Sequence, residues 1–234
     1  MTTDHYDPHG QALLDYFNGD TSATILIHEG GKQKEVPLSL FFRGWDEFPS
    51  LERKAIEMCR GRVLDIGAGT GCHSLVLQER GLFVYAIDFL ADCVEIMKRR
   101  GVKEAHCGNI HTFDAEPFDT LLCLMNGIAV VENLDGLEPF LSSIRRLIKP
   151  DGQFLIDSTD RRPQRQDGEI SGSGDRYSGA AHLQLEYKNK KGRPFTQLYV
   201  DPETLAKHAG KAGYQCEVIE EGGNHRYLAL LTLR

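Results

Sequence analysis

The stretch Arg62-Val-Leu-Asp-Ile-Gly-Ala-Gly-Thr-Gly71 decides the fold, and the segment from Cys72 to Arg80 follows it directly. Val63, Leu64 and Ile66 form a short apolar run that is typical of a buried parallel strand. The glycines allow a tight turn, and the amides at the start of the next helix favour electron-rich groups of a ligand. The stretch therefore predicts a strand, a ligand-binding turn and a helix.

Two features distinguish this turn from the dinucleotide-binding fingerprint G-x-G-x-x-G. That fingerprint requires glycine where this chain has Cys72, and it does not ask for an acid where this chain has Asp65. The next apolar run predicts a second buried strand that ends at Asp88, about 20 residues after Gly67. A carboxylate at that position can accept hydrogen bonds from both hydroxyls of a ligand ribose.

With these residues the chain resembles the class I S-adenosylmethionine-dependent methyltransferases, from about Leu51 to Arg234 and most strongly from Val63 to Gly71. The resemblance implies an α/β fold with a Rossmann-like, doubly wound, mostly parallel sheet of about seven strands and an antiparallel C-terminal strand. A small N-terminal helix and hairpin and an inserted β-hairpin are expected besides this sheet. The implied methyl donor is S-adenosyl-L-methionine, with S-adenosyl-L-homocysteine as its product.

The resemblance also implies where the donor binds. The backbone around Gly67 would contact the methionine portion, Asp65 would lie near its ammonium group and Asp88 would hold the ribose. Asn109 and Ile110 would contact the adenine through a carbonyl oxygen and a backbone amide. The expected donor-binding residues are Asp65, Gly67, Ala68, Gly69, Gly71, Asp88, Phe89, Asn109, Ile110, Met125 and Asn126.

The chain is expected to divide into an N-terminal cap, residues 1–48, and a methyltransferase domain, residues 49–234, with a loop and hairpin inserted at 159–200. Residues 1–10 are expected to form a mobile terminus. The aromatic segment Leu38–Trp45 has two interpretations, core packing or a lid over the ligand. Arg43 in this segment is expected to meet a carboxylate of the acceptor.

The acceptor side is less constrained by the pattern. Phe118–Met125 predicts a central strand buried on both faces, so that Asn126 should border the reacting methyl group. The segment 158–181 has no apolar period and is interpreted as a functional or a disordered loop, in which Arg161 is a candidate for substrate contact. Of Asn126, Asp157, Arg161, His111 and His225, none is assigned as a catalytic base.

Composition limits the function classes. The 234 residues are 41% hydrophobic and 26% charged, with a net charge of −7, which disfavours nucleic acid as a partner. No apolar run approaches the roughly 20 residues that span a bilayer, and the first residues lack a signal pattern, so a cytoplasmic protein is expected. The six cysteines contain no C-x-x-C, which favours free thiols and no metal site.

The combined prediction is methyl transfer to a small-molecule acceptor with an N, O or C nucleophile. Cys123–Asn126 looks similar to small-molecule N-methyltransferases of the glycine and sarcosine type, and an N-P-P-Y motif of nucleic-acid enzymes is absent. Two alternatives stay open, a nicotinamide-dependent oxidoreductase and a nucleoside-binding module without transfer activity. The acceptor and the oligomeric state are left open as well.

Overall fold

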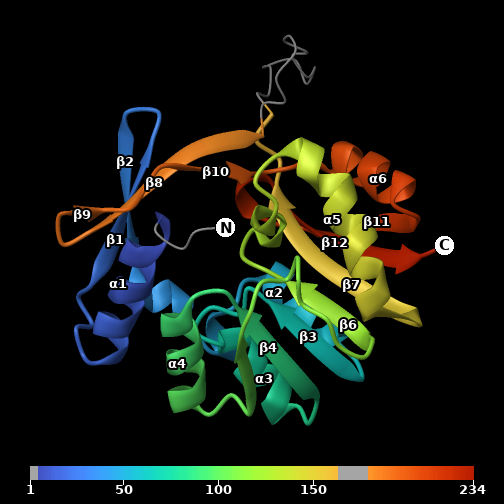
Figure 1. The fold of residues 1–234 in the computed structure, drawn as a ribbon, viewed down its shortest axis with the longest axis horizontal. Coiled ribbons are helices and arrows are strands. Elements are labelled where there is room, and N and C mark those ends of the chain that lie inside the picture. The colour runs from blue at the N-terminus through green and yellow to red at the C-terminus, as the bar shows by residue number, and fades with distance from the viewer. Residues whose placement is uncertain (1–4, 163–178) are drawn as a thin grey trace.

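The computed structural model describes residues 5–162 and 179–234, and its larger sheet has the strand order β11-β12-β7-β6-β3-β4-β5 (Figure 1). Neighbouring strands from β7 to β5 pair in parallel, whereas β12 is antiparallel to both β7 and β11. This arrangement confirms the expected doubly wound sheet with an antiparallel C-terminal strand. The strands are β3 (Arg62–Ile66), β4 (Phe83–Asp88), β5 (Glu104–Cys107), β6 (Phe118–Cys123), β7 (Ile148–Thr159), β11 (Tyr214–Glu221) and β12 (Arg226–Leu233).

Helices cover both faces of this sheet, because its central strands are apolar at almost every position. Leu121 of β6 is buried in one cluster with residues of α5 and α6, and the next residue, Leu122, is buried in another cluster with residues of α2 and α3. Successive side chains of a strand point to opposite faces, so an uninterrupted apolar run builds two cores. The helices are α2 (Ser50–Met58), α3 (Cys72–Glu79), α4 (Ala91–Arg100), α5 (Leu137–Ile144) and α6 (Pro202–Lys211).

A second sheet has the order β10-β8-β1-β2, with β9 paired to β8. The N-terminal hairpin and the inserted hairpin were expected as separate elements, but β1 pairs antiparallel with β8 and joins them. Figure 1 shows this sheet at one side of the molecule, with β8 and β10 arching towards the larger sheet. Its strands are β1 (Thr24–Glu29), β2 (Lys32–Pro37), β8 (Ala180–Tyr187), β9 (Lys190–Lys191) and β10 (Phe195–Leu198).

Residues 5–10 lead into a helix and form its first turn, so the expectation of a mobile terminus is wrong for these residues. Helix α1 (Asp7–Phe17) begins with Pro8 in its first turn, where a missing N–H costs nothing. Leu13 of this helix is fully buried in a cluster with residues of β1, β8 and α4. Residues 1–4 lie outside the described residues, and so does 163–178, the main part of the predicted irregular loop.

Residues 149–152 lie within β7, although their sequence, Lys-Pro-Asp-Gly, is typical of a turn. Pairing with β6 shifts register between Phe118↔Ile148 and Thr120↔Gln153, so the extra residues form an irregularity in the strand. A bulge tolerates Pro150, which has no N–H to give to a ladder. Before β7, two short 3-10 turns, η5 (Leu134–Gly136) and η6 (Arg145–Leu147), lie on either side of α5.

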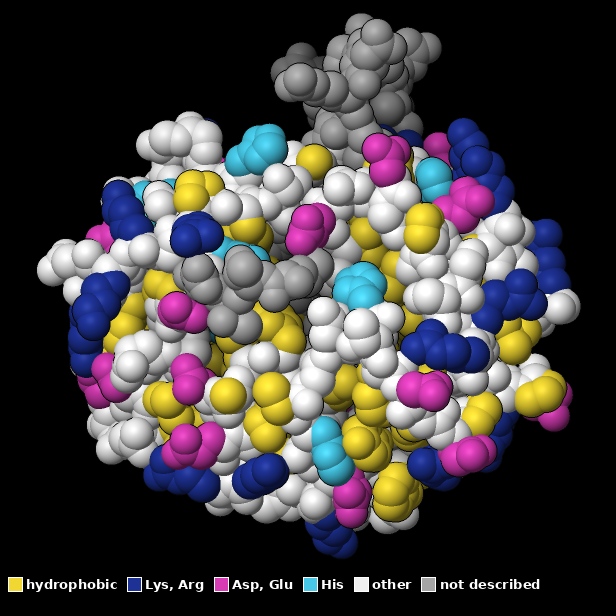
Figure 2. Space-filling model, viewed as in Figure 1, with side chains coloured by type: hydrophobic (Ala, Val, Ile, Leu, Met, Phe, Trp, Pro, Cys, Tyr) yellow, Lys and Arg dark blue, Asp and Glu magenta, His cyan; other side chains and the backbone are white. Residues whose placement is uncertain are grey.

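The surface carries charges of both signs. On the face drawn in Figure 2, Lys and Arg side chains are scattered among Asp and Glu side chains. In the part of the chain that the structure describes, no helix has the length and apolar character that a membrane crossing requires.

Candidate functional site

The glycine turn lies at the carboxyl end of β3, where a ligand can approach its backbone. Gly67 and Gly69 have φ angles of 68° and 56°, which an L side chain rarely adopts. A Cβ atom at either position would meet no other atom within 4 Å. The amides of Gly67 and Ala68 donate to the carbonyl of Ile87 at 2.9 and 3.1 Å. The turn is therefore held by β4 on one side and open on the other.

Asp88 stands beside this turn at the end of β4. Its Oδ2 accepts from the amide of Gly69 at 2.9 Å, and its Oδ1 accepts from the amide of Leu90 at 2.9 Å. Burial raises the pKa of Asp88 to about 6. A carboxylate oxygen has two lone pairs, so both oxygens keep acceptor capacity. The carboxylate is fixed in orientation and is still able to bind hydroxyl donors.

Three adjoining cavities surround these groups. The strand-end cavity, of about 340 Å³, lies beyond β4 and β5; the glycine-turn cavity, of about 240 Å³, lies over the glycine turn and the end of β6. The sheet cavity, of about 810 Å³, lies against one face of the smaller sheet. Tyr6, His9, Phe41 and Gln197 line both the glycine-turn cavity and the sheet cavity, so these two meet at those side chains.

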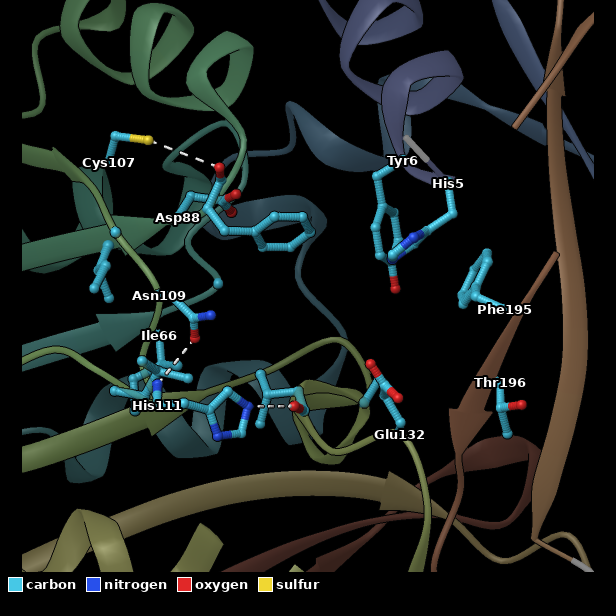
Figure 3. A pocket seen from close by; sticks show the side chains of 17 residues that line it. His5, Tyr6, Ile66, Asp88, Cys107, Asn109, His111, Glu132, Phe195 and Thr196 are labelled. Carbon is cyan, nitrogen blue, oxygen red and sulfur yellow. Dashed lines mark hydrogen bonds between the residues drawn. The ribbon is translucent and has the colours of Figure 1, made fainter. Parts of the chain in front are cut away.

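Figure 3 shows the strand-end cavity, with Asp88 and Asn109 on one side and Tyr6 and Phe195 on the other. The side-chain oxygen of Asn109 accepts from the backbone amide of His111 at 3.0 Å, and the His111 Nε2 lies 3.2 Å from the carbonyl oxygen of Val130. Asn109 thus closes a local turn, while its side-chain oxygen has room for a second donor.

The loop after β6 is strained. Met125 and Asn126 are consecutive non-glycine residues with φ angles of 64° and 63°. Such backbone persists only where its surroundings hold it, and it is concentrated at functional sites. The Asn126 Nδ2 donates to the carbonyl of Leu198 at 3.2 Å, and the next amide, that of Gly127, donates to Asp157 at 2.8 Å.

A buried ionic cluster supports this loop. The carboxylate of Glu52, 1% exposed, lies 3.0 Å from Arg43, 2.9 Å from His73 and 3.6 Å from Arg226. Arg226 also pairs with Asp157 at 2.7 Å. Burial acts to raise the pKa of Glu52, but the histidine and the two arginines outweigh it and hold that pKa below its usual value.

Arg43 therefore meets a carboxylate, but one that belongs to the chain itself. Its guanidinium also lies 3.7 Å from the sulfur of Met125, and so it links the N-terminal segment to the strained loop. Arg161, the other arginine expected to contact substrate, lines the sheet cavity and pairs with Glu29 at 2.7 Å. Its role and that of Arg43 toward an acceptor stay predictions.

Most of the residues expected at the donor site come together in space. Gly71 and Arg43 line none of the three cavities, and a Cβ at Gly71 would come within 2.7 Å of Val102. Gly71 thus allows close packing at the start of α3. The strand-end and glycine-turn cavities together are lined by Asp65, Gly67, Ala68, Gly69, Asp88, Phe89, Asn109, Ile110, Met125 and Asn126.

Asp65 is 2% exposed and accepts from the hydroxyl of Ser74 at 2.6 Å. Burial raises its pKa above the ordinary value. The six cysteines are free thiols. Within residues 5–162 and 179–234, no three His, Cys, Asp or Glu side chains gather in a way that could hold a metal ion.

Sequence reasoning missed Tyr6 and His9. Both were assigned to a mobile terminus, yet they lie at the start of α1, three residues apart and so on one helix face. The available signal was Pro8, which indicates the first turn of a helix and would have placed this face earlier in the chain.

Comparisons with known proteins agree with this geometry. A family model described as a methyltransferase domain matches residues 64–156. The crystal structure of an S-adenosylmethionine-dependent methyltransferase from Bacteroides fragilis, in complex with S-adenosyl-L-homocysteine, has 37% sequence identity and a TM-score of 0.89. The match covers 100% of this chain and 97% of the Bacteroides chain.

Two curated relatives match over shorter parts. A ubiquinone biosynthesis O-methyltransferase of Rickettsia conorii is 25% identical over 68% of this chain and 56% of its own length. A demethylmenaquinone methyltransferase of Clavibacter sepedonicus is 33% identical over 41% of this chain and 40% of its own length. The chain thus spans about half the length of these curated relatives. Because the similarity to the Bacteroides protein extends over both whole chains, this chain belongs to the S-adenosylmethionine-dependent methyltransferase family.

Proposed function

We propose that this protein transfers a methyl group from S-adenosylmethionine to a small molecule bound in the sheet cavity. The observation that carries the proposal is the open glycine turn beside the fixed carboxylate of Asp88, in a cavity that shares lining residues with the sheet cavity. The strand-end and glycine-turn cavities would take the nucleoside and the amino-acid tail of the donor. The sheet cavity has room for an acceptor.

The residues present fit the donor. The open backbone of Gly67 and Gly69 would face the methionine portion, and Asp65 would lie near the ammonium group. Asp88 would accept hydrogen bonds from the ribose, and Asn109 would lie beside the adenine in the strand-end cavity. The Bacteroides relative, similar over its whole length, was solved with S-adenosyl-L-homocysteine, which supports this assignment.

The chemistry asks little of individual side chains. A sulfonium donor supplies an already activated methyl group, and transfer is an in-line displacement. The protein has to hold donor and nucleophile at near-attack distance and exclude water. Tyr6, His9 and Phe41 stand where the two cavities meet, and so they would border the reacting atoms.

The two alternatives are less well supported. Cys72 is buried at the first position of α3, where the dinucleotide fingerprint needs a glycine. A binding module without transfer activity needs no acceptor cavity, whereas this chain has a cavity of about 810 Å³ that adjoins the donor site. The names of the curated relatives refer to ubiquinone biosynthesis and to demethylmenaquinone, which supports a small-molecule acceptor.

Calorimetric titration with S-adenosylmethionine, S-adenosyl-L-homocysteine and NADH tests the proposal. We expect the first two to bind with roughly micromolar dissociation constants and NADH not to bind. A screen of amines, phenols and acids for release of S-adenosyl-L-homocysteine would then identify acceptors. Binding of NADH alone would overturn the methyltransferase proposal.

Donor binding is expected to weaken in mild acid. Burial raises the pKa of Asp88 to about 6, and the ribose hydroxyls bind the ionised carboxylate better than the protonated one. Below pH 6 the free protein holds a proton that binding must release, so affinity should fall by up to about tenfold per pH unit. Titrations with S-adenosyl-L-homocysteine between pH 8 and pH 5 measure this slope. Asp88→Asn, which does not titrate, should lose the part of the slope that Asp88 contributes.

A further inference from the structure

We infer that the sheet cavity takes an acceptor with an apolar or aromatic body and an anionic group, and that Lys32 and Lys34 bind the anionic group. This inference rests on the proposed function and names the substrate class of the same site. Three parts of the cavity lining carry it: an apolar floor, a cationic edge and an uncharged polar end next to the donor.

The apolar floor follows from strand register. Ile27 of β1 pairs with Leu185 of β8, and Leu183 of β8 pairs with Phe195 of β10. Residues paired in register share a face of the sheet, and so do alternate residues of one strand. All four side chains line the cavity. They form a continuous apolar surface across three strands, which is suited to a flat or hydrocarbon body.

The cationic edge lies on β2, at the border of that floor. Lys34 pairs with Ile27 and Lys32 pairs with Glu29, so both lysines belong to the face that lines the cavity. Among residues 5–162 and 179–234, neither lysine forms an ion pair, and the carboxylate of Glu29 is bound by Arg161 at 2.7 Å.

Charge in the cavity is thus opposite in sign to the charge of the whole chain. Among the described residues that line the cavity there are three cations, Lys32, Lys34 and Arg161, and one carboxylate, that of Glu29. The protein as a whole has a net charge of −7. A concave surface of one sign attracts ligands of the other sign, and a lysine ammonium binds a carboxylate or phosphate as a point charge.

The end of the cavity next to the donor is polar but uncharged. Among the described residues, the Tyr6 hydroxyl and the His9 imidazole make no hydrogen bond, and in Figure 3 the Tyr6 hydroxyl points into the space between Asp88 and Phe195. Burial raises the pKa of Tyr6 to about 12 and lowers that of His9 to about 4, so both are neutral near pH 7. Neutral groups of this kind can form hydrogen bonds with the N–H or O–H of a nucleophile. They do not compete with the lysines for the anionic group.

Matched pairs of acids and amides test the inference on the protein saturated with S-adenosyl-L-homocysteine. The probes are 4-hydroxybenzoate with 4-hydroxybenzamide, and 4-phenylbutanoate with 4-phenylbutanamide. In at least one pair the acid should bind about tenfold or more tightly than the amide, measured by calorimetry. The double variant Lys32→Gln/Lys34→Gln should bind that acid no better than its amide. Lys191→Gln, which removes a lysine that pairs with Glu186 and does not line the cavity, is the matched control and should keep the preference.

Lysines on an edge strand also discourage pairing with other chains, and that purely protective role predicts a different outcome. Equal binding of acids and amides, an acid preference that survives in the double variant, or no binding of any probe at low millimolar concentration would each overturn the inference. Titration with S-adenosyl-L-homocysteine alone separates the two proposals. If that ligand binds and the acids show no preference, the substrate class is wrong while the proposed function stands.

Discussion

Replacing Asp88 by alanine is expected to weaken the binding of S-adenosyl-L-homocysteine by about 100-fold or more. The carboxylate is fixed by the amides of Gly69 and Leu90, so in the proposed site it would be preorganised to accept from two ribose hydroxyls. Hydrogen bonds to a charged group contribute about 1.5–3 kcal/mol each, and the loss of two corresponds to at least this factor. Calorimetric titration of wild type and variant measures the change.

The matched control is Glu95→Ala, which removes an exposed carboxylate of α4 that pairs with Arg99 and lines none of the three cavities. It should leave the affinity unchanged. Circular dichroism shows whether Asp88→Ala folds, which separates loss of a binding group from loss of structure. A folded Asp88→Ala protein with wild-type affinity would rule out this carboxylate as the ribose acceptor.

Replacing Glu52 by glutamine is expected to lower the free energy of unfolding by about 3–5 kcal/mol, because it leaves buried cations without their counter-charge. Glu52 is 1% exposed and lies within 3.0 Å of both Arg43 and His73. Glutamine keeps the volume of the side chain but removes the charge. Since domains of this size are stabilised by only about 5–15 kcal/mol, the loss is a large fraction of the total. Urea denaturation, followed by fluorescence or circular dichroism, measures it.

Glu57→Gln on the same helix is the matched control, because Glu57 is exposed. Its effect on stability should be small. Arg43 contacts the sulfur of Met125, so Glu52→Gln should also weaken donor binding at temperatures where the variant is still folded. Equal unfolding midpoints for Glu52→Gln and Glu57→Gln would contradict a stabilising role for the buried cluster.

The donor-binding residues could be predicted because the pattern that indicates them is local in the sequence. Val63–Gly71 joins an apolar strand to glycines that only a tight, ligand-facing turn requires, and Asp88 follows at the next strand end. Parallel strands of one sheet bring their carboxyl ends to the same edge, so residues from four strand ends meet without any further information. The same rule placed Asn126 near this edge, and the resemblance to the methyltransferases implied Asn109. Both residues line the cavities there.

Arg43 shows where local reasoning was insufficient. Its position before the first domain helix indicated a basic residue near the site, and it does lie beside Met125. Whether its charge faces a ligand or the chain depends on where Glu52 and His73 come to rest, and helix packing decides that. The sequence around Arg43 does not indicate which charged residue of another segment will pack against it.

By itself the sequence determined the fold class and the donor-binding turn, because contiguous residues and the order of strands encode both. Only the tertiary structure decided the acceptor side. The sheet cavity is built from α1, from the N-terminal hairpin and from the inserted hairpin, which are far apart in the chain and are joined by the pairing of β1 with β8. That pairing depends on backbone hydrogen bonds that any two exposed strand edges can form, so no residue pattern specifies it in advance. Tyr6, His9 and Lys34 therefore became candidates for acceptor contact only when the strands had placed them around one cavity.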